Sequence, residues 1–423
     1  MKSLEKILLY VLIFSLPFNI KKFIVNPIKI EHVTEFGSIF LYLSDILILI
    51  LLALWLVRII KKRKIKVIKI PLWEIFLIIF ILILVLSLFW SQNLTLSIYS
   101  TVKILLCIGL FIYLKNNLTK KTFLNSLKII SLGGVLQSFI TLIQFIKQSS
   151  LGIVYLGESV VSRSLAGIAK IDVGNIKIIR SYGTFSHPNI LGAFLLLALY
   201  CSIYLVLKKR KVFLLTLPFL VLGLILTFSR SILFFGLIPL IIFLTYKFFK
   251  NRKIEILKPL FAIILSILIL SIPLSPLLIQ RVAIDSQDQA VSLRIFYNKS
   301  AIEMIKKSPL VGVGLRNSTL ELKKIYPDLE DWQYQPVHNI YLLIASEVGI
   351  LGLLVFILFL LFLFKRSTEL EIVNQERHMF LILTSVFLIL GLFDHYFFTI
   401  NQGIIIFWLI LGITSTKHKK INS

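Results

Sequence analysis

The sequence predicts an all-α integral membrane protein that crosses the bilayer about twelve times. Of its 423 residues, 58% are hydrophobic and 16% are charged, whereas charged residues make up about a quarter of a typical soluble domain. The mean hydropathy is +0.94. Apolar stretches of about 20 residues, the length that a helix needs to cross the hydrocarbon core, recur along the whole chain. These observations exclude a soluble globular protein.

Each predicted span is an apolar stretch bounded by charged or turn-forming residues. No small-residue cleavage pattern follows the first stretch, so we expect it to remain as a helix rather than to be removed as a signal peptide. In chain order the predicted spans are 7–26, 39–58, 72–90, 96–114, 122–146, 188–207, 212–228, 231–248, 259–279, 338–364, 379–394 and 401–416.

The basic residues indicate which side of the membrane each connection faces. The chain holds 46 Lys and Arg against 20 Asp and Glu, a formal net charge of +26. Short cytoplasmic loops carry such an excess, so we expect both termini in the cytoplasm. The same placement excludes a nucleic-acid-binding protein, whose cations would gather in a folded basic domain. More than half of the cations lie near the N-terminus or at 58–69, 115–121, 208–211, 247–258, 365–377 and 417–420.

Two connections on the predicted external side are long. Long loops in a chain of otherwise short connections often carry function. Within the second, Ala290 to Lys307 has apolar residues near helical spacing with charged residues between them, which predicts an amphipathic helix at the membrane surface. The expected organisation is 1–147 with spans one to five, 148–187 as an external loop, 188–279 with spans six to nine, 280–337 as the large external loop, and 338–423 with spans ten to twelve and a cytoplasmic tail.

A histidine precedes a stripe of small residues in the tenth predicted span. On a continuous helix Gly349 lies within about 20° of His338, Gly352 lies within about 40°, and Ala345 shares this face. Small residues let a neighbouring helix approach closely, which would hold the imidazole rigidly. A packing seam with an interfacial histidine explains the same spacing, so the pattern alone leaves both interpretations open.

His338-Asn339, followed after nine residues by Gly349 and then Gly352, resembles the hallmark of the O-antigen ligase family, whose conserved region is shared with O-antigen polymerases. The resemblance covers the second half of the chain, with the long external loop in the expected place. The other segments that carry it, in the expected order, are Arg180 to Asn189, Thr227 to Ser231, Ser292 to Arg294 and Pro309 to Gly314.

This resemblance implies a multi-span glycosyltransferase of GT-C-like type in the bacterial inner membrane. Its donor would be a glycan on undecaprenyl pyrophosphate, and its acceptor the lipid A core or another surface acceptor. The resemblance gives His338 the role of catalytic histidine and Arg230 and Arg294 the roles of functional arginines. The topology inferred from the basic residues places all three on the external face.

The residue types fit the chemistry that the resemblance implies. Histidine has an unperturbed pKa of about 6.5, so at pH 7 it is mostly neutral and can accept the proton of an attacking hydroxyl. Arginine stays cationic and binds phosphate oxygens through paired hydrogen bonds, so Arg230 and Arg294 would hold the pyrophosphate without a metal ion. An arginine that reaches phospholipid headgroups, or a solvated one, is the alternative for these positions.

Two further segments are candidate auxiliary sites. Arg180 precedes a run through His187 that opens the sixth span, where a helix N-terminus favours anions such as pyrophosphate. Pro188 in the same run also fits an ordinary helix start. Asp394 and His395 follow the eleventh span, where they can position an imidazole, contact sugar hydroxyls or form a simple interfacial loop.

The remaining polar residues are expected to play supporting roles. Asn339 is an auxiliary residue beside His338 in the hallmark. Glu347 lies about 180° from His338 on a continuous helix, so we expect it to bond to another span, with Lys103 as a candidate partner. The sequence predicts no cofactor and no metal ion.

Two alternatives stay open from the sequence. A multi-span transporter has a similar composition, although its site usually lies at the bilayer midplane between related repeats, whereas no internal repeat is visible in this chain and its informative polar residues gather at one face. Among enzymes, a polymerase that adds repeat units shares its donor chemistry with a ligase. The hallmark favours the ligase.

Overall fold

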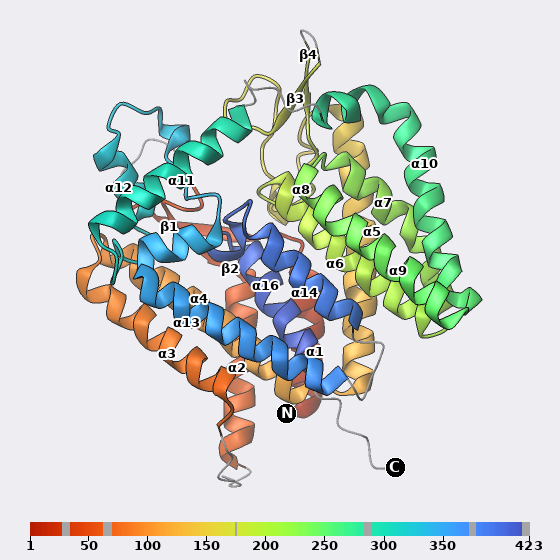
Figure 1. Ribbon diagram of the computed structural model, residues 1–423, viewed down its shortest axis with the longest axis horizontal. Helices are drawn as coiled ribbons and strands as arrows, with labels where there is room; N and C mark the ends of the chain where they lie inside the picture. Colours follow the sequence, from red (N-terminus) through yellow and green to blue (C-terminus); the bar gives the residue numbers. More distant parts are fainter. Residues whose placement is uncertain (28–33, 62–69, 174–175, 283–288, 372–377, 417–423) are drawn as a thin grey trace.

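The computed structural model describes residues 1–27, 34–61, 70–173, 176–282, 289–371 and 378–416. Helices fill most of this part of the chain, together with two antiparallel hairpins (Figure 1). The elements of the first half are α1 (Lys2–Ser15), β1 (Lys21–Val25), β2 (Ile39–Tyr42), α2 (Leu43–Lys61), α3 (Leu72–Leu86) with a 3-10 turn (Ser87–Trp90), α4 (Leu94–Asn117), α5 (Lys120–Lys147), a 3-10 turn (Val154–Leu156), β3 (Lys170–Val173), β4 (Ile176–Ile179) and α6 (Pro188–Leu207).

The regular elements of the second half are all helical in the described residues. Its elements are a 3-10 turn (Lys211–Thr216), α7 (Leu217–Leu226), α8 (Arg230–Ile232), a π-helical turn (Leu233–Leu237), α9 (Ile238–Asn251), α10 (Ile254–Val282), α11 (Gln289–Lys307), α12 (Ser318–Ile325), a 3-10 turn (Asp331–Gln333), α13 (Ile340–Glu371), α14 (His378–Leu390), α15 (Tyr396–Thr399) and α16 (Asn401–Thr414). The helix expected at 290–307 is present as α11.

The prediction of a mostly helical membrane protein is confirmed. Four helical segments that are too short for a full span occupy the other predicted spans. They are Lys211–Leu226, α14, α16 and the 14-residue α1. Twelve crossings therefore stay a prediction, since these four are shorter than a full span. Within the described residues, eight helical segments are long and apolar enough to cross a membrane: Leu43–Lys61, Leu72–Trp90, Leu94–Asn117, Lys120–Lys147, Pro188–Leu207, Arg230–Asn251, Ile254–Arg281 and Ile340–Glu369.

The first predicted span, 7–26, is not a continuous helix. Helix α1 ends at Ser15, and β1 begins at Lys21 and pairs antiparallel with β2. Pro17 lies just beyond the helix end, where a residue without a backbone N–H cannot continue the hydrogen-bond ladder. Two short hairpins, β1–β2 and β3–β4, accompany the predicted helices.

Helix α6 forms the centre of the bundle. Its apolar window is 94% buried, and α5, α7 and α14 pack around it. A helix that is apolar on every side is expected in the core. Beside this group, α13 packs on α3 and α16 packs on α4. The rings of Phe111, Phe359 and Trp408 join α4, α13 and α16, with centroids 5.8 to 6.1 Å apart.

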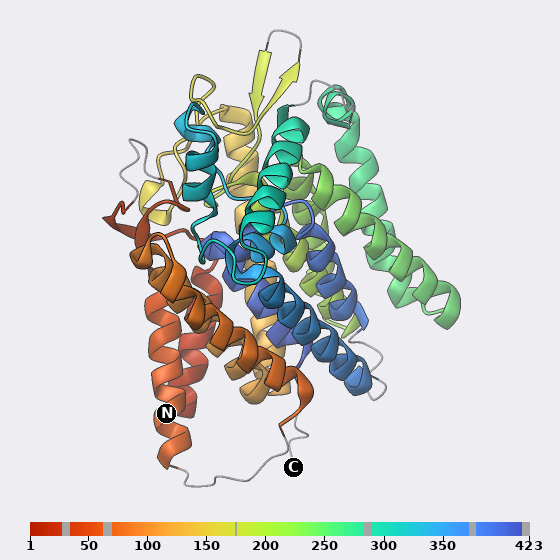
Figure 2. The same cartoon turned by 60° about the vertical axis from the view of Figure 1, so that its left-hand side comes forward.

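The bundle has two distinct ends. Arg58 at the end of α2 donates two hydrogen bonds to Glu5 of α1 and one to Asn117 at the end of α4. Gly412 near the end of α16 packs on Leu114 of α4. The start of the first helix and the end of the last therefore lie together. The β3–β4 hairpin, α11 and α12 project from the opposite end, which we call the loop end (Figures 1 and 2).

Lys103 joins three helices through a buried ion pair. Its Nζ lies 2.6 and 2.5 Å from the two carboxylate oxygens of Asp45 in α2. The same ammonium donates to Asn401 Oδ1 at 2.7 Å, at the start of α16. The prediction that Lys103 partners Glu347 is therefore wrong, because α4 packs against α2 and α16 whereas α13 packs against α3.

Glu347 instead anchors the segment that leads into α12. Its carboxylate accepts hydrogen bonds from Arg316 N at 2.8 Å and from Ser318 Oγ at 2.6 Å. Both donors belong to the connection between α11 and α12 and to the first residue of α12, so the expected bond to another span is also wrong. The buried carboxylate fixes this connection against the first part of α13.

Helix α13 breaks at Gly349, which overturns the stripe argument. Gly349 has φ 84° and ψ 167°, and His338 precedes the helix, which begins at Ile340. The two residues are therefore not on one continuous helical face. The break frees the carbonyls of Ser346 and Glu347, which accept from Val313 N and Gly314 N. Ile350 N donates to Pro309 O in return. Two of the segments that carry the family resemblance are therefore joined through their backbones.

Gly349→Ala is expected to destabilise the protein strongly. A Cβ at Gly349 would lie 2.0 Å from Leu310 O, a backbone atom, and the positive φ disfavours any L side chain. We expect a loss of at least about 2 kcal/mol, seen as a lower apparent melting temperature of the purified protein.

Gly352→Ala is the matched control three residues on. A Cβ there would meet Val348 Cγ1 at 3.0 Å and Ile83 Cγ2 at 3.6 Å, and both are side-chain atoms. Its cost should stay within about 1 kcal/mol, because alanine also raises helix propensity. Equal destabilisation by the two substitutions would contradict the role of the break.

Candidate active site

His338 lies at the loop end, in the segment that leads into α13. Its Nδ1 is 3.1 Å from Pro336 O. Because a carbonyl oxygen can accept but not donate, Nδ1 carries the proton and Nε2 is the basic nitrogen of the neutral ring. Asn339 follows as the cap of α13, and its Oδ1 accepts from Tyr341 N and Leu342 N. This capping bond gives Asn339 a structural role in holding His338.

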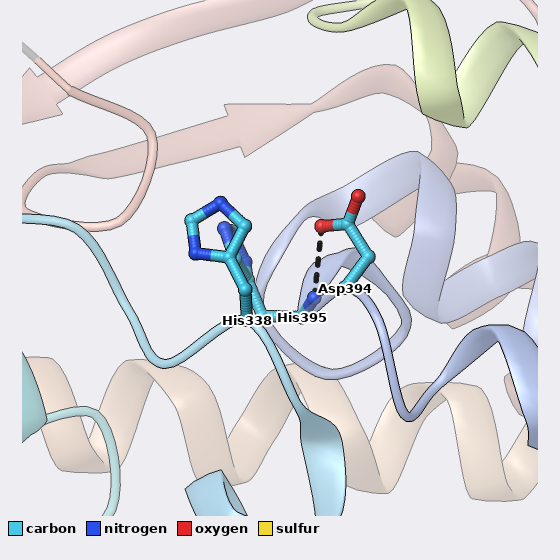
Figure 3. A group of neighbouring side chains, drawn as sticks. All are labelled: His338, Asp394 and His395. Carbon is cyan, nitrogen blue, oxygen red and sulfur yellow. Dashed lines mark hydrogen bonds between the residues drawn. The ribbon is translucent and has the colours of Figure 1, made fainter. Parts of the chain in front are cut away.

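Two rings fix the plane of the His338 imidazole. Tyr297 of α11 stacks on it with centroids 5.3 Å apart and an interplanar angle of 13°. His395 meets it edge to face at 4.7 Å and 89° (Figure 3). Tyr297 is itself held by a hydrogen bond from its hydroxyl to Gln333 O at 2.6 Å. The amphipathic helix α11 therefore supplies one wall of the site.

Asp394 connects His395 to the start of α6. Its Oδ1 accepts from His395 N at 2.9 Å (Figure 3). Its Oδ2 accepts from Asn189 Nδ2 at 2.7 Å, and Asn189 Oδ1 accepts in turn from Arg180 Nη2 at 2.6 Å. Arg180, Asn189 and Asp394 are all buried. A continuous polar chain thus runs from Arg180 to the pair of histidines.

His187 caps α6 rather than projecting as a separate group. Its Nδ1 accepts from Asn189 N at 3.1 Å, and Pro188 occupies the first helical turn. The helix-start interpretation of this segment is therefore confirmed. Burial, followed by the charge of Arg180, lowers the pKa of His187 to about 3. A neutral ring at this position is required for its capping bond.

The two functional arginines implied by the resemblance lie on different elements. Arg294 of α11 donates from Nε to Phe393 O at 3.2 Å, directly before Asp394. Arg230 opens α8 after the turn at 227–229. Phe235, on the π-helical turn that follows α8, stacks on Phe393 at 4.9 Å. The structure therefore brings Arg294 to the histidine pair and attaches the Arg230 segment to the same loop through Phe393.

Arg316 and Thr399 support His395, and the sequence did not indicate either. Arg316 Nη1 donates to Thr399 O at 3.1 Å. Thr399 Oγ1 lies 2.6 Å from His395 Nδ1 and donates to the His395 carbonyl, so the ring nitrogen is the donor of the shorter bond. Arg316 also donates to the carbonyls of Glu35 and Phe36. These contacts tie α15 to the segment before β2.

The charges at the site favour a neutral His338 beside an ionised Asp394. Burial lowers the pKa of His338, Asp394 opposes this effect, and Arg294 adds to it. Burial alone would raise the pKa of Asp394, but His338, His395, His187 and Arg294 lower it to about 2. The carboxylate is therefore charged at neutral pH and can stabilise a proton that His338 takes up.

His338, Asp394 and His395 also form a donor set that can hold a metal ion. Their ligand atoms all lie within 4.8 Å of one another. Imidazole nitrogens and carboxylate oxygens are ligands that zinc and similar cations accept. Each Asp394 oxygen already accepts one hydrogen bond, from His395 N or from Asn189 Nδ2. The donors also suit acid–base chemistry, which the sequence favours.

The sequence gives little indication of two further candidate residues, Asn189 and Tyr297. Asn189 lies within the segment that carries the resemblance, but its central position between Arg180 and Asp394 depends on the fold. Tyr297 lies three residues after Arg294, on the amphipathic helix, and no motif distinguishes it. The links through Arg316 and Thr399 have no signal in the sequence, because they join segments far apart in the chain.

A neutral imidazole, a buried carboxylate and several arginines at one end of an apolar helical bundle define an integral membrane protein with an enzyme-like site. The family model described as O-antigen ligase matches residues 215–357. The match confirms the resemblance to the O-antigen ligase family over this region of the chain. The family implies a membrane glycosyltransferase of the O-antigen ligase or polymerase type. The matched region contains Arg230, Arg294 and His338. No curated protein matches the chain.

Acid should destabilise the fold through His395. Burial lowers its pKa to about 3, so as pH falls below the ordinary value of about 6.5 the unfolded chain binds a proton that the folded chain does not. The free energy of unfolding therefore falls as the pH drops below about 6.5, by about 1.4 kcal/mol for one histidine near pH 5.5. We therefore expect the apparent melting temperature of His395→Gln to fall less than that of the wild type between pH 7.5 and about pH 5.5.

His378→Gln is the matched control, because His378 is exposed at the start of α14. It should show the same pH dependence as the wild type. If His395→Gln and the wild type lose equal stability over this range, His395 is not the titrating group.

Proposed function

We propose that the protein transfers a glycan from undecaprenyl pyrophosphate to an acceptor hydroxyl, as an O-antigen ligase does. The acceptor is the lipid A core or another surface molecule. In this proposal the bundle is a twelve-span, GT-C-like transferase of the bacterial inner membrane, with both termini in the cytoplasm and the loop end on the external face. The observation that carries the proposal is the group of His338, Asp394 and His395, whose ligand atoms lie within 4.8 Å of one another, with Arg294 bonded to the adjacent Phe393.

The proposed reaction is a displacement at the anomeric carbon. The acceptor oxygen forms the new glycosidic bond while the bond from the anomeric carbon to the pyrophosphate oxygen breaks. His338 Nε2 takes the proton of the acceptor hydroxyl, and Asp394 stabilises the imidazolium that results. Arg230 and Arg294 bind the pyrophosphate as it leaves with its bonding electrons.

Arg180 contributes to this reaction mainly by positioning. Its Nε donates to Thr227 O at 2.8 Å and its Nη2 to Asn189 Oδ1 at 2.6 Å. It therefore fixes both the turn before Arg230 and the amide that holds Asp394. The pyrophosphate contact expected from the sequence would use its remaining N–H groups.

His338→Ala is expected to lower glycan transfer at least about a hundredfold, because the base for the acceptor hydroxyl is lost. Arg230→Ala should also abolish transfer while the protein is still produced and inserted. The measurement is surface glycan in a deletion strain complemented with each variant. His378→Ala, at the start of α14, should restore the glycan fully.

The glycan that accumulates separates the two family activities. Full-length polymer retained on its lipid carrier in His338→Ala cells indicates a ligase. Single repeat units on the core indicate a polymerase, which is the alternative with the same donor chemistry. Normal surface glycan in His338→Ala cells would refute the base assignment, and uptake of a solute by proteoliposomes without transfer would favour a transporter.

Transfer by the purified protein should be insensitive to excess chelator. The proposal assigns pyrophosphate binding to arginines, which stay cationic without a metal ion. Transfer is measured with lipid-linked donor before and after treatment with EDTA, and again after Mg²⁺ or Mn²⁺ is returned. Complete dependence on the added cation would overturn the metal-independent mechanism and point to the donor set of His338, Asp394 and His395.

A further inference from the structure

Hydrogen bonds hold the Nδ1 atoms of His338 and His395 and select the same tautomer in both rings. His338 Nδ1 lies 3.1 Å from Pro336 O, and His395 Nδ1 donates to Thr399 Oγ1 at 2.6 Å. In each neutral ring Nε2 therefore carries the lone pair and no proton. A histidine that binds a metal ion through one ring nitrogen usually donates a hydrogen bond from the other, which orients the ring. Both rings already have this arrangement.

The distances between three side chains of the site suit one small ion. The rings of His338 and His395 meet at 89° with centroids 4.7 Å apart. Two imidazoles on one tetrahedral zinc, with nitrogens at about 2.0 to 2.1 Å from it, have centroids about 5 Å apart. Ligand atoms of these residues and of Asp394 lie within 4.8 Å of one another. The three side chains extend in the same direction (Figure 3), so small rotations bring them onto a common ion.

Asp394 can bind a cation and keep its present contacts. One of its oxygens accepts from His395 N at 2.9 Å, and the other accepts from Asn189 Nδ2 at 2.7 Å. An ionised carboxylate has about four lone-pair positions, so both oxygens retain acceptor capacity. Its negative charge also opposes the repulsion between a divalent cation and Arg294, which donates to Phe393 O.

The chemistry of the donors selects the kind of cation. Two imidazole nitrogens and a carboxylate are ligands that zinc accepts, whereas Mg²⁺ and Ca²⁺ prefer oxygen. His187 is not a further ligand, because its Nδ1 accepts from Asn189 N and the proton of its neutral ring is then on Nε2. Three protein ligands leave the fourth position of a tetrahedral zinc to water.

We propose that His338, Asp394 and His395 form a zinc site that inhibits the enzyme. Zinc on His338 Nε2 occupies the lone pair that would take the proton of the acceptor hydroxyl, so the zinc-bound protein lacks its base. The binding of zinc does not depend on the proposed function, whereas the inhibition rests on it. Glycan transfer itself stays independent of metal ions.

Binding is measured by calorimetric titration of Zn²⁺ into metal-free, full-length protein in phosphatidylcholine nanodiscs. His395→Gln and Asp394→Asn each remove one ligand. Each should raise the Kd at least about tenfold, because even the loss of a supporting hydrogen bond commonly costs that much affinity. His378→Gln is the matched control, since His378 is exposed at the start of α14, and it should leave the Kd unchanged. An unchanged Kd in either ligand variant would overturn the three-residue site.

Cobalt in the wild-type protein tests the coordination without any variant. Four-coordinate Co²⁺ absorbs visible light strongly, whereas six-coordinate Co²⁺ in water absorbs weakly. We expect the strong spectrum when Co²⁺ is added to the metal-free protein, and its loss when Zn²⁺ displaces the cobalt. A spectrum equal to that of Co²⁺ in water would contradict coordination by these side chains.

Inhibition is measured as glycan transfer from lipid-linked donor by the same samples. Zn²⁺ should stop wild-type transfer at concentrations near its Kd, and EDTA should restore the transfer. In His395→Gln, inhibition relative to the zinc-free rate of that variant should need at least about tenfold more Zn²⁺. Transfer that requires Zn²⁺ would overturn the inhibitory role.

The two measurements separate this inference from the proposed function. If the wild type transfers glycan and Zn²⁺ neither binds nor inhibits, the zinc inference fails and the function stands. If the wild type binds Zn²⁺ at the three residues but transfers no glycan with or without it, the proposed function fails and the zinc site stands.

Discussion

The candidate site depends on one buried carboxylate. Asp394 accepts hydrogen bonds from the side chain of Asn189 and from the backbone of His395. Asn189 is held by Arg180, which also holds the turn before Arg230. A buried charge must be paired and hydrogen-bonded, so the start of α6, the α14–α15 connection and the 227–229 turn cannot move independently. This constraint positions the arginines relative to His338.

Helix length and apolar composition made the bundle predictable, because a membrane span is specified by a stretch of apolar residues with little regard to its partners. The predictions that failed assumed an ideal helix. The angular positions of Gly349 and Glu347 relative to His338 hold on a continuous helix, but the chain leaves helical geometry at Gly349 and His338 precedes the helix. A segment from another part of the chain, Pro309 to Gly314, fills the break, and local periodicity carries no information about it.

The candidate site was predictable where a motif marks a residue and unpredictable where the fold joins distant segments. His338, Arg294 and the pair Asp394-His395 do meet, although they come from three separate segments. Asn189 and Arg316 act through hydrogen bonds to residues between 9 and 281 positions away. Such contacts depend on which helices are neighbours, and composition and charge pattern do not specify that arrangement.

The protonation states follow from the same burial that holds the site together. Removing His338 from water disfavours its cation, while Asp394 favours it. In the proposed reaction, the neutral ring would take up a proton beside this charged partner. Arg294 opposes that proton until negative charge arrives nearby. A bound diphosphate would supply this charge and make His338 a stronger base when donor is present. In the proposed reaction, binding of the donor would therefore favour proton uptake by His338.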